Sequence, residues 1–116
     1  MLHRNKRREN IIMTNTIRLV QDWAKERGID KADPAKQLLK LTEEVGELAA
    51  SFIRGDDANM QLEIGDILVV LTIFCQQTEN SLESCFNGAY KKIKDRHGKN
   101  VNGVFVKSTD GLDWQR

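Results

Sequence analysis

The chain has 116 residues, of which 30% are charged, with 18 lysines and arginines against 17 aspartates and glutamates. This length predicts one domain with a hydrophobic core of its own. The near balance of charge excludes a general attraction to nucleic acids or membranes. Cys75 and Cys85 have no C-x-x-C spacing, so we expect free, buried thiols in a reducing cytoplasm.

The chain begins with a basic stretch, "RNKRR", at residues 4–8, and no apolar segment follows it. It is therefore not a secretory signal. Because Met13 stands just before a good helix start, we interpret residues 1–12 as a flexible basic arm and residues 13–116 as the domain. An arm that binds nucleic acid is the alternative, but the pattern supports it less, so nucleic acid is disfavoured as a partner.

Three glycines, Gly28, Gly55 and Gly98, each follow a helical pattern, as residues just after a helix end should. They divide the chain into four predicted helices, at about 15–27, 34–54, 57–78 and 81–97. Asp33 and Pro34 have the residue types expected at the start of the second helix. After Gly98, the pair Asn102-Gly103 between apolar residues predicts a short hairpin.

The third predicted helix is apolar around nearly its whole circumference from Ile64 to Cys75, which indicates a central, buried helix. Its β-branched residues could instead indicate a strand. We favour a helix because the apolar pattern starts at Met60 and no turn signal interrupts it. Its longest apolar run, "ILVVLTIFC", is shorter than the roughly 20 residues of a membrane span, so no membrane partner is expected.

Two pairs of carboxylates share the same spacing on neighbouring helices. Glu44 and Glu47 are three residues apart, as are Glu63 and Asp66, so each pair lies on one helix face. Like charges at this spacing destabilise an isolated helix, so a compensating role is expected. The second pair projects beside apolar positions, beyond the first turn where the helix dipole would favour acids.

The first pair has a simpler alternative interpretation as a solvated acidic face. Lys40 lies three and four residues before Glu43 and Glu44 and could be an ordinary ion-pair partner for them. If the four carboxylates converge instead, an oxygen-only cluster favours hard divalent ions, Mg²⁺ first and Mn²⁺ second. Di-iron and zinc sites are disfavoured, because neither histidine follows a glutamate by three residues and no Cys/His cluster exists.

Basic residues that could meet a phosphate lie in the fourth predicted helix. Lys92 and Arg96 are four residues apart and fall on the edge of its apolar stripe, so they lean toward the other helices. The alternative is that they only complement the negative end of the helix dipole. A magnesium–carboxylate cluster with cationic partners suits phosphate chemistry.

These residues together resemble the MazG-like family of all-α nucleoside triphosphate pyrophosphohydrolases. That family carries an E-x-x-E pair on one helix and an E-x-x-D pair on the next, which "EVGE" at 44–47 and "EIGD" at 63–66 match. Its Lys-x-x-x-Arg is matched by Lys92 and Arg96, whereas an asparagine found before that lysine in some members is Tyr90 here. The resemblance covers roughly residues 16–106 and implies a four-helix bundle with a short extended or hairpin tail.

The resemblance also implies a role for each residue. Mg²⁺, with Mn²⁺ as a substitute, would be coordinated by Glu44, Glu47, Glu63 and Asp66. Glu43 would help to orient or deprotonate the water that attacks the α-phosphorus, and Glu47 would be catalytic as well. The attack would release pyrophosphate and a nucleoside monophosphate. The triphosphate would be contacted by Lys40, Lys92 and Arg96. Family members form dimers or tetramers, so a homodimer or homotetramer is expected.

A second class of function stays open. The chain could be a non-catalytic helical interaction or regulatory module that binds nucleotide or nucleic acid, with the basic residues at its start as the contact. It predicts salt-sensitive binding that depends on residues 1–12. Under the catalytic interpretation, the carboxylates of both helices are needed for turnover.

Overall fold

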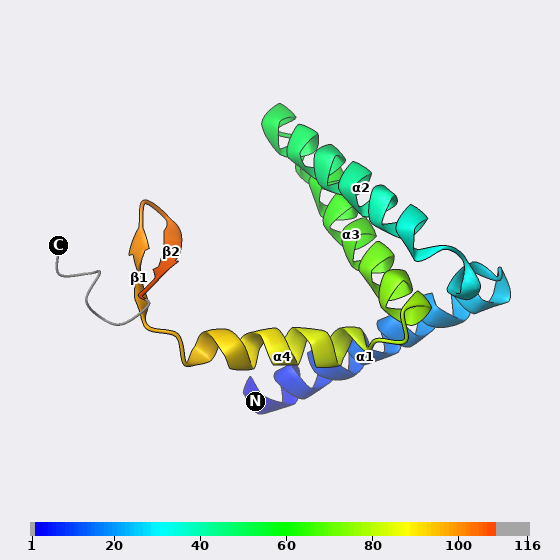
Figure 1. The fold of residues 1–116 in the computed structure, drawn as a ribbon, viewed down its shortest axis with the longest axis horizontal. Coiled ribbons are helices and arrows are strands. Elements are labelled where there is room, and N and C mark those ends of the chain that lie inside the picture. Colours follow the sequence, from blue (N-terminus) through cyan, green and yellow to red (C-terminus); the bar gives the residue numbers. More distant parts are fainter. Residues whose placement is uncertain (1, 109–116) are drawn as a thin grey trace. The chain divides into compact units, whose positions relative to one another are not determined.

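The computed structural model describes residues 2–108, and the chain divides into two compact units between Leu82 and Glu83. Its fold class is all-α, as predicted: the described residues form four α-helices and one two-stranded hairpin (Figure 1). The elements are α1 (Leu2–Glu26), the short 3-10 helix η1 (Ile29–Lys31), α2 (Pro34–Arg54), α3 (Asp57–Gln77), α4 (Leu82–Lys94), β1 (Gly98–Val101) and β2 (Val104–Lys107).

The first helix starts earlier than predicted. It begins at Leu2, so the start expected near Asn15 is wrong, and the described residues of the expected arm are the first turns of α1. Residues 2–14 contain neither glycine nor proline, so nothing breaks the helical hydrogen bonding. The hydroxyl of Thr16 donates to the carbonyl of Ile12, which shows the helix continuing through the expected cap. A domain boundary at residue 13 stays a prediction.

The second and third helices lie side by side and are joined by two residues (Figure 1). Asp33 caps α2 through its carboxylate, Pro34 occupies the first turn, and Gly55 ends the helix with a left-handed backbone, φ 71°. Asp56 then caps α3, accepting a backbone N–H with its side chain. The predicted bounds of both helices are confirmed, and so short a link makes the two helices antiparallel.

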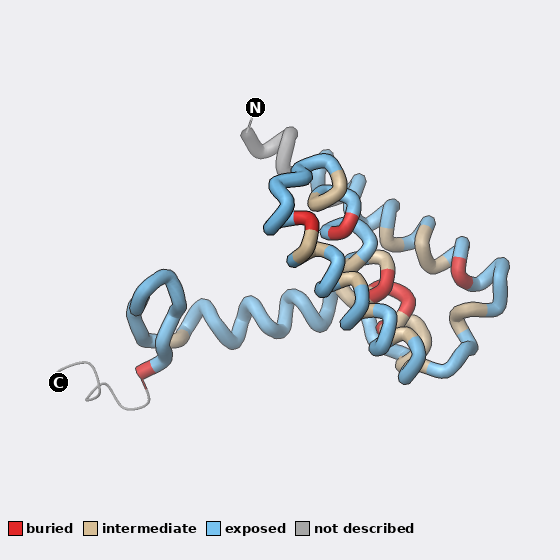
Figure 2. The backbone as a smooth tube through the Cα atoms, turned by 90° about the horizontal axis from the view of Figure 1, so that it is seen from above, coloured by how far each residue is buried: buried red, intermediate tan, exposed pale blue. Residues whose placement is uncertain are grey.

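The core of the first unit lies around the C-terminal half of α3. Val70, Ile73 and Cys75 are buried there, and Ala24 of α1 is fully buried (Figure 2). Two glutamines tie this half of α3 to its neighbours: Gln76 Nε2 donates to the Gln21 carbonyl of α1 at 3.1 Å, and Gln77 Nε2 donates to the Ile29 carbonyl of η1 at 2.9 Å. These bonds fix the end of α3 against α1 and η1.

The third helix is not buried on all sides, which corrects the expectation from its apolar sequence. In the part of α3 that precedes Val70, Leu62, Ile64 and Leu68 are 68%, 46% and 41% exposed. Within the described first unit, α2 covers one side of α3, while α1 and η1 pack against it too. Over its full length α3 is long and apolar enough to cross a membrane by length and composition, a test that the core helix of a soluble protein also passes.

The second unit contains α4 and the predicted hairpin, which is confirmed. β1 and β2 pair antiparallel, and Asn102 and Gly103 form the turn with positive φ angles of 52° and 86°. Gly98 lies against the ring of Phe105, where any side chain would collide with the ring and with the Val106 carbonyl. The tail after Ser108 lies outside the described residues.

The fourth helix differs from its prediction in two respects. It ends at Lys94 instead of near His97, because the His97 carbonyl accepts the Ser108 N–H at 2.8 Å and continues the hairpin ladder. Cys75 is buried as expected, but Cys85 is exposed, so the prediction of two buried thiols is wrong for the second. Among the described residues of the second unit, up to Ser108, α4 has no other helix against which its apolar stripe could pack.

Candidate metal centre

Three carboxylates from two helices meet at the centre of the α2–α3 pair. One oxygen each of Glu44, Glu63 and Asp66 lies within 4.8 Å of the other two. Glu63 and Asp66 share a face of α3 because they are three residues apart. Glu44 reaches them from α2 because the short link places the helices antiparallel and in contact. The structure therefore brings together three of the four predicted metal ligands.

The Glu63 carboxyl has the least ordinary environment of the cluster. Its residue is 8% exposed, and Glu63 Oε2 and Glu44 Oε2 are buried without a hydrogen-bond partner among the described residues. A side-chain hydrogen bond with Glu44, burial, and the negative charges of Glu47 and Glu44 raise the pKa of Glu63 from 4.5 to about 7. Protonation of Glu63 at pH values below about 7 therefore reduces the repulsion among these carboxylates.

The fourth predicted ligand, Glu47, lies beside this group. It is exposed, and both its charge and a side-chain hydrogen bond act on Glu63 and raise the pKa of that residue. Glu47 is one turn from Glu44 on α2, so the two project to the same face. Glu47 therefore lies close enough to act on Glu63, the most enclosed member of the three-carboxylate cluster, but it is not itself part of that cluster.

The donor set fits a hard divalent cation. It consists of carboxylate oxygens only, the ligand type that Mg²⁺ and Mn²⁺ prefer over zinc or copper. The two unpartnered buried oxygens, on Glu44 and Glu63, are the groups that a cation would satisfy. A cation would also replace the proton that the raised pKa of Glu63 retains, because metal ligands must be deprotonated.

Two other predicted site residues lie on α2 close in sequence to the cluster. Glu43 and Lys40 are both exposed. Within the described part of the chain, Lys40 makes no ion pair with Glu43 or Glu44, so the ordinary ion-pair interpretation is not seen. Both side chains are accessible to a ligand, and their catalytic and binding roles stay predictions.

The two predicted phosphate contacts of the second unit do not share a helix. Lys92 is exposed on α4, whereas the half-buried Arg96 lies beyond the last residue of that helix. The expectation that both project from one helix edge is therefore wrong, since the chain leaves the helix before entering β1. That they contact a triphosphate stays a prediction.

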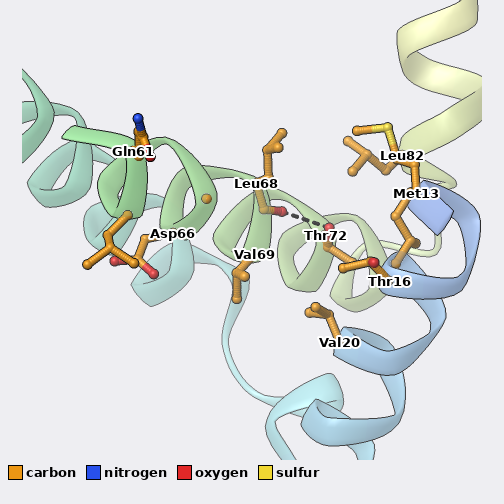
Figure 3. Close-up of a pocket in the computed structure, with 12 residues that line it drawn as sticks. Met13, Thr16, Val20, Gln61, Asp66, Leu68, Val69, Thr72 and Leu82 are labelled. Carbon is orange, nitrogen blue, oxygen red and sulfur yellow. Dashed lines mark hydrogen bonds between the residues drawn. The ribbon is translucent and has the colours of Figure 1, made fainter. Parts of the chain in front are cut away.

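An apolar pocket of about 380 Å³ adjoins the carboxylates in the first unit (Figure 3). It lies between α1, with Met13 and Val20, and α3, with Val69 and Thr72. Asp66 lies at one end, so one member of the carboxylate cluster also faces this pocket. The sequence did not predict the pocket, because it arises from the packing of α1 against α3 and not from a local pattern.

Two polar residues near the link between the helices were also missed from the sequence. Ser51 is fully buried, and its Oγ accepts a hydrogen bond from Asn59 Nδ2 at 2.7 Å. The available signal was their spacing: Ser51 follows Glu47 by four residues, and Asn59 precedes Glu63 by four. They therefore lie one turn from the carboxylates, on the same faces of α2 and α3.

Comparison with known proteins identifies a family whose matched region contains the four carboxylates. Residues 33–101 match the family described as the MazG nucleotide pyrophosphohydrolase domain. An uncharacterised 18.2 kDa protein from the rep-hol intergenic region of Haemophilus phage HP1 is 34% identical over 62 residues, which cover 53% of this chain and 38% of that protein. No solved structure gives a significant match. Since the family match includes α2, α3 and α4 and more than half of all residues, this chain belongs to the MazG nucleotide pyrophosphohydrolase family.

Proposed function

We propose that the protein is a Mg²⁺-dependent nucleoside triphosphate pyrophosphohydrolase. It hydrolyses a nucleoside or deoxynucleoside triphosphate to the monophosphate and pyrophosphate by attack of water at the α-phosphorus. The observation that carries the proposal is the convergence of Glu44, Glu63 and Asp66, with buried, unpartnered oxygens on the first two. The family match supports the same reaction class.

Catalysis in this proposal is mainly positioning and charge neutralisation. When bound, the cation neutralises phosphate charge, and it is held by Glu44, Glu47, Glu63 and Asp66. Mn²⁺ replaces Mg²⁺ because its preference for oxygen ligands is similar. Glu43 orients the attacking water, and the exposed Glu47 accepts its proton. The triphosphate is bound by Lys40, Lys92 and Arg96, which offset its negative charge.

The protein acts as a homodimer or homotetramer in the cytoplasm in this proposal. Phe52 and Ile53 of α2 are 71% and 81% exposed, and Leu62 of α3 is 68% exposed. Large apolar side chains exposed on two neighbouring helices support association with a second copy of the chain. Light scattering coupled to size exclusion should give twice or four times the chain mass, and a monomer at micromolar concentration contradicts this part.

The proposed reaction is tested by pyrophosphate release from a panel of canonical and modified nucleoside triphosphates with Mg²⁺. Glu47→Gln and Glu63→Gln should abolish the release. Asp57→Asn is the matched control, because Asp57 is an exposed acid in the first turn of α3, outside the cluster. No release from any nucleotide, or equal release by Glu63→Gln, contradicts the proposal. Tight nucleotide binding without turnover identifies a non-catalytic binding module instead.

A further inference from the structure

The hydrogen bond between Ser51 and Asn59 lies next to the link between α2 and α3 and has no role in the proposed chemistry itself. We infer that Ser51 and Asn59 are positioning residues, which set the register of the two helices and thereby hold the carboxylates in reach of one cation. The inference rests on the proposed function, because that function requires the cation. It concerns two residues that touch neither substrate nor metal in the proposal.

Ser51 is the centre of a buried polar contact. It is 0% exposed, and its hydroxyl donates to the Glu47 carbonyl at 2.9 Å while it accepts from Asn59 Nδ2 at 2.7 Å. Arg54 Nη2 also approaches the same oxygen, at 3.5 Å. The bond from Asn59 crosses from α3 to α2, so it links a defined residue of one helix to a defined residue of the other. Such a link specifies the axial register, which apolar contacts specify less sharply.

The register that this bond sets is the one that pairs the carboxylates. In antiparallel helices, equal steps away from a contact, backward along one helix and forward along the other, arrive at the same level. Four steps from the Ser51–Asn59 contact lead to Glu47 and Glu63 at a level roughly 6 Å away. Seven steps lead to Glu44 and Asp66, two turns from the contact. Steps of four and seven keep to one helix face, so all three levels lie along the α2–α3 interface.

A change of register would disperse the cluster. A slip of one residue moves a helix by about 1.5 Å and turns its side chains by about 100°. The three carboxylate oxygens now lie within 4.8 Å of one another, and such a turn would direct Glu44 away from Glu63. Repulsion among the carboxylates favours such a displacement whenever no cation or proton is present. The Ser51–Asn59 bond opposes it from the adjacent turn.

The chain offers a matched control at the other end of α3. Thr78 Oγ1 donates to the Phe74 carbonyl at 2.9 Å and accepts from Asn80 Nδ2 at 2.9 Å. The hydrogen bonds are of the same kind as at Ser51. In both places a hydroxyl donates to a backbone carbonyl of its own helix and accepts from the side-chain amide of an asparagine. Thr78 and Asn80 are close in sequence and join no second helix, so this bond fixes no register between helices.

The test compares Ser51→Ala and Asn59→Ala with Thr78→Val in the full-length protein. Mn²⁺ binding is measured by electron paramagnetic resonance and Mg²⁺ binding by calorimetry, beside thermal melts, kcat and KM. Both α2–α3 variants should bind Mn²⁺ about tenfold more weakly, as when a residue that orients a metal ligand is lost. Their kcat should fall more than their KM rises, and Thr78→Val should match the wild type in cation binding, kcat and KM.

The outcomes distinguish the positioning role of Ser51 and Asn59 from the proposed hydrolytic function. Wild-type Mn²⁺ affinity in a folded Asn59→Ala protein, or an equal loss in Thr78→Val, overturns the inference. Asn59 is only half-buried, so this variant remains informative if Ser51→Ala does not fold. Weaker Mn²⁺ binding by both α2–α3 variants, in a protein that hydrolyses no nucleotide, supports the positioning role and contradicts the proposed function. A wild type that binds no Mn²⁺ contradicts both.

Discussion

The two halves of α3 have opposite electrostatic and packing characters. The first half carries Glu63 and Asp66, whose carboxylates crowd together with Glu44, and it exposes apolar side chains. The second half buries Val70 and Ile73 and donates two side-chain hydrogen bonds to neighbouring elements. One half therefore holds groups that repel one another, and the other supplies packing that keeps the helix in place. Stabilising contacts and the proposed functional residues thus lie in different halves of a single helix.

The sharpest test of this separation is Glu63→Gln, which keeps the side-chain shape and removes the charge. Metal-assisted stabilisation of phosphate charge is worth several kcal/mol, so kcat should fall on the order of 1,000-fold. Without metal, the melting temperature should stay equal or rise, because a repulsive charge has been removed. A pyrophosphate-release assay and thermal melts in chelator measure the two effects. If Glu63→Gln loses stability and keeps its activity, the first half of α3 contributes to stability and not to function, which contradicts the proposed separation.

A substitution in the second half of α3 should have the opposite effect, lowering stability without weakening metal binding. Ile73 is 3% exposed, and Ile73→Ala should lower the free energy of unfolding by about 2–5 kcal/mol through lost burial and a cavity. The protein that remains folded should bind Mn²⁺ with wild-type affinity. Urea unfolding and Mn²⁺ titration below the transition are the measurements. A large loss of Mn²⁺ affinity would show that the two halves are coupled.

A smaller effect is expected at the end of the helix. Gln77→Ala removes the bond to the Ile29 carbonyl and should cost about 1 kcal/mol of unfolding free energy. Hydrogen exchange should increase in η1 and at the end of α1, while the turn around Glu63 keeps its protection. Faster exchange around Glu63 would show that the two halves of α3 are coupled, which contradicts their proposed separation.

The pH dependence of stability has a defined predicted sign. The folded protein raises the pKa of Glu63 from 4.5 to about 7, so between these values it binds more protons than the unfolded chain. Stability without metal should therefore fall as the pH rises through this range. Saturating Mg²⁺ should reduce the fall, because the cation compensates the negative charge of the deprotonated Glu63 carboxylate. Thermal melts from pH 4.5 to 8 test this, and a rise in stability without metal contradicts it.

The sequence predicted the elements well where local chemistry determines them. Asp33, Pro34 and Gly55 determine the ends of α2 through capping and backbone preference, and Asn102-Gly103 determines the hairpin turn. The start of α1 was missed because the cap preference of Asn15 is weaker than an uninterrupted helix-forming segment. Local signals therefore sufficed for α2 and the hairpin turn, but not for the start of α1, where two of them competed.

The site was predicted less completely than the fold. Periodicity showed which face each carboxylate occupies, but it could not show that Glu63 is buried while Glu47 is exposed, since depth depends on the partner helix. The pairing of Ser51 with Asn59 depends on the register, which no single helix determines. The pocket beside Asp66 depends on α1 lying against α3, a contact between distant segments.

The two-residue link between α2 and α3 also bears on how the protein folds. It closes a very small loop, so the loop-closure entropy lost when these two helices first meet is low. Helical hairpins with such local contacts form in microseconds to milliseconds, whereas docking α1 onto α3 brings together segments far apart in the chain. The carboxylates should thus be brought together early in folding, before the C-terminal end of α3 forms its contacts with α1 and η1.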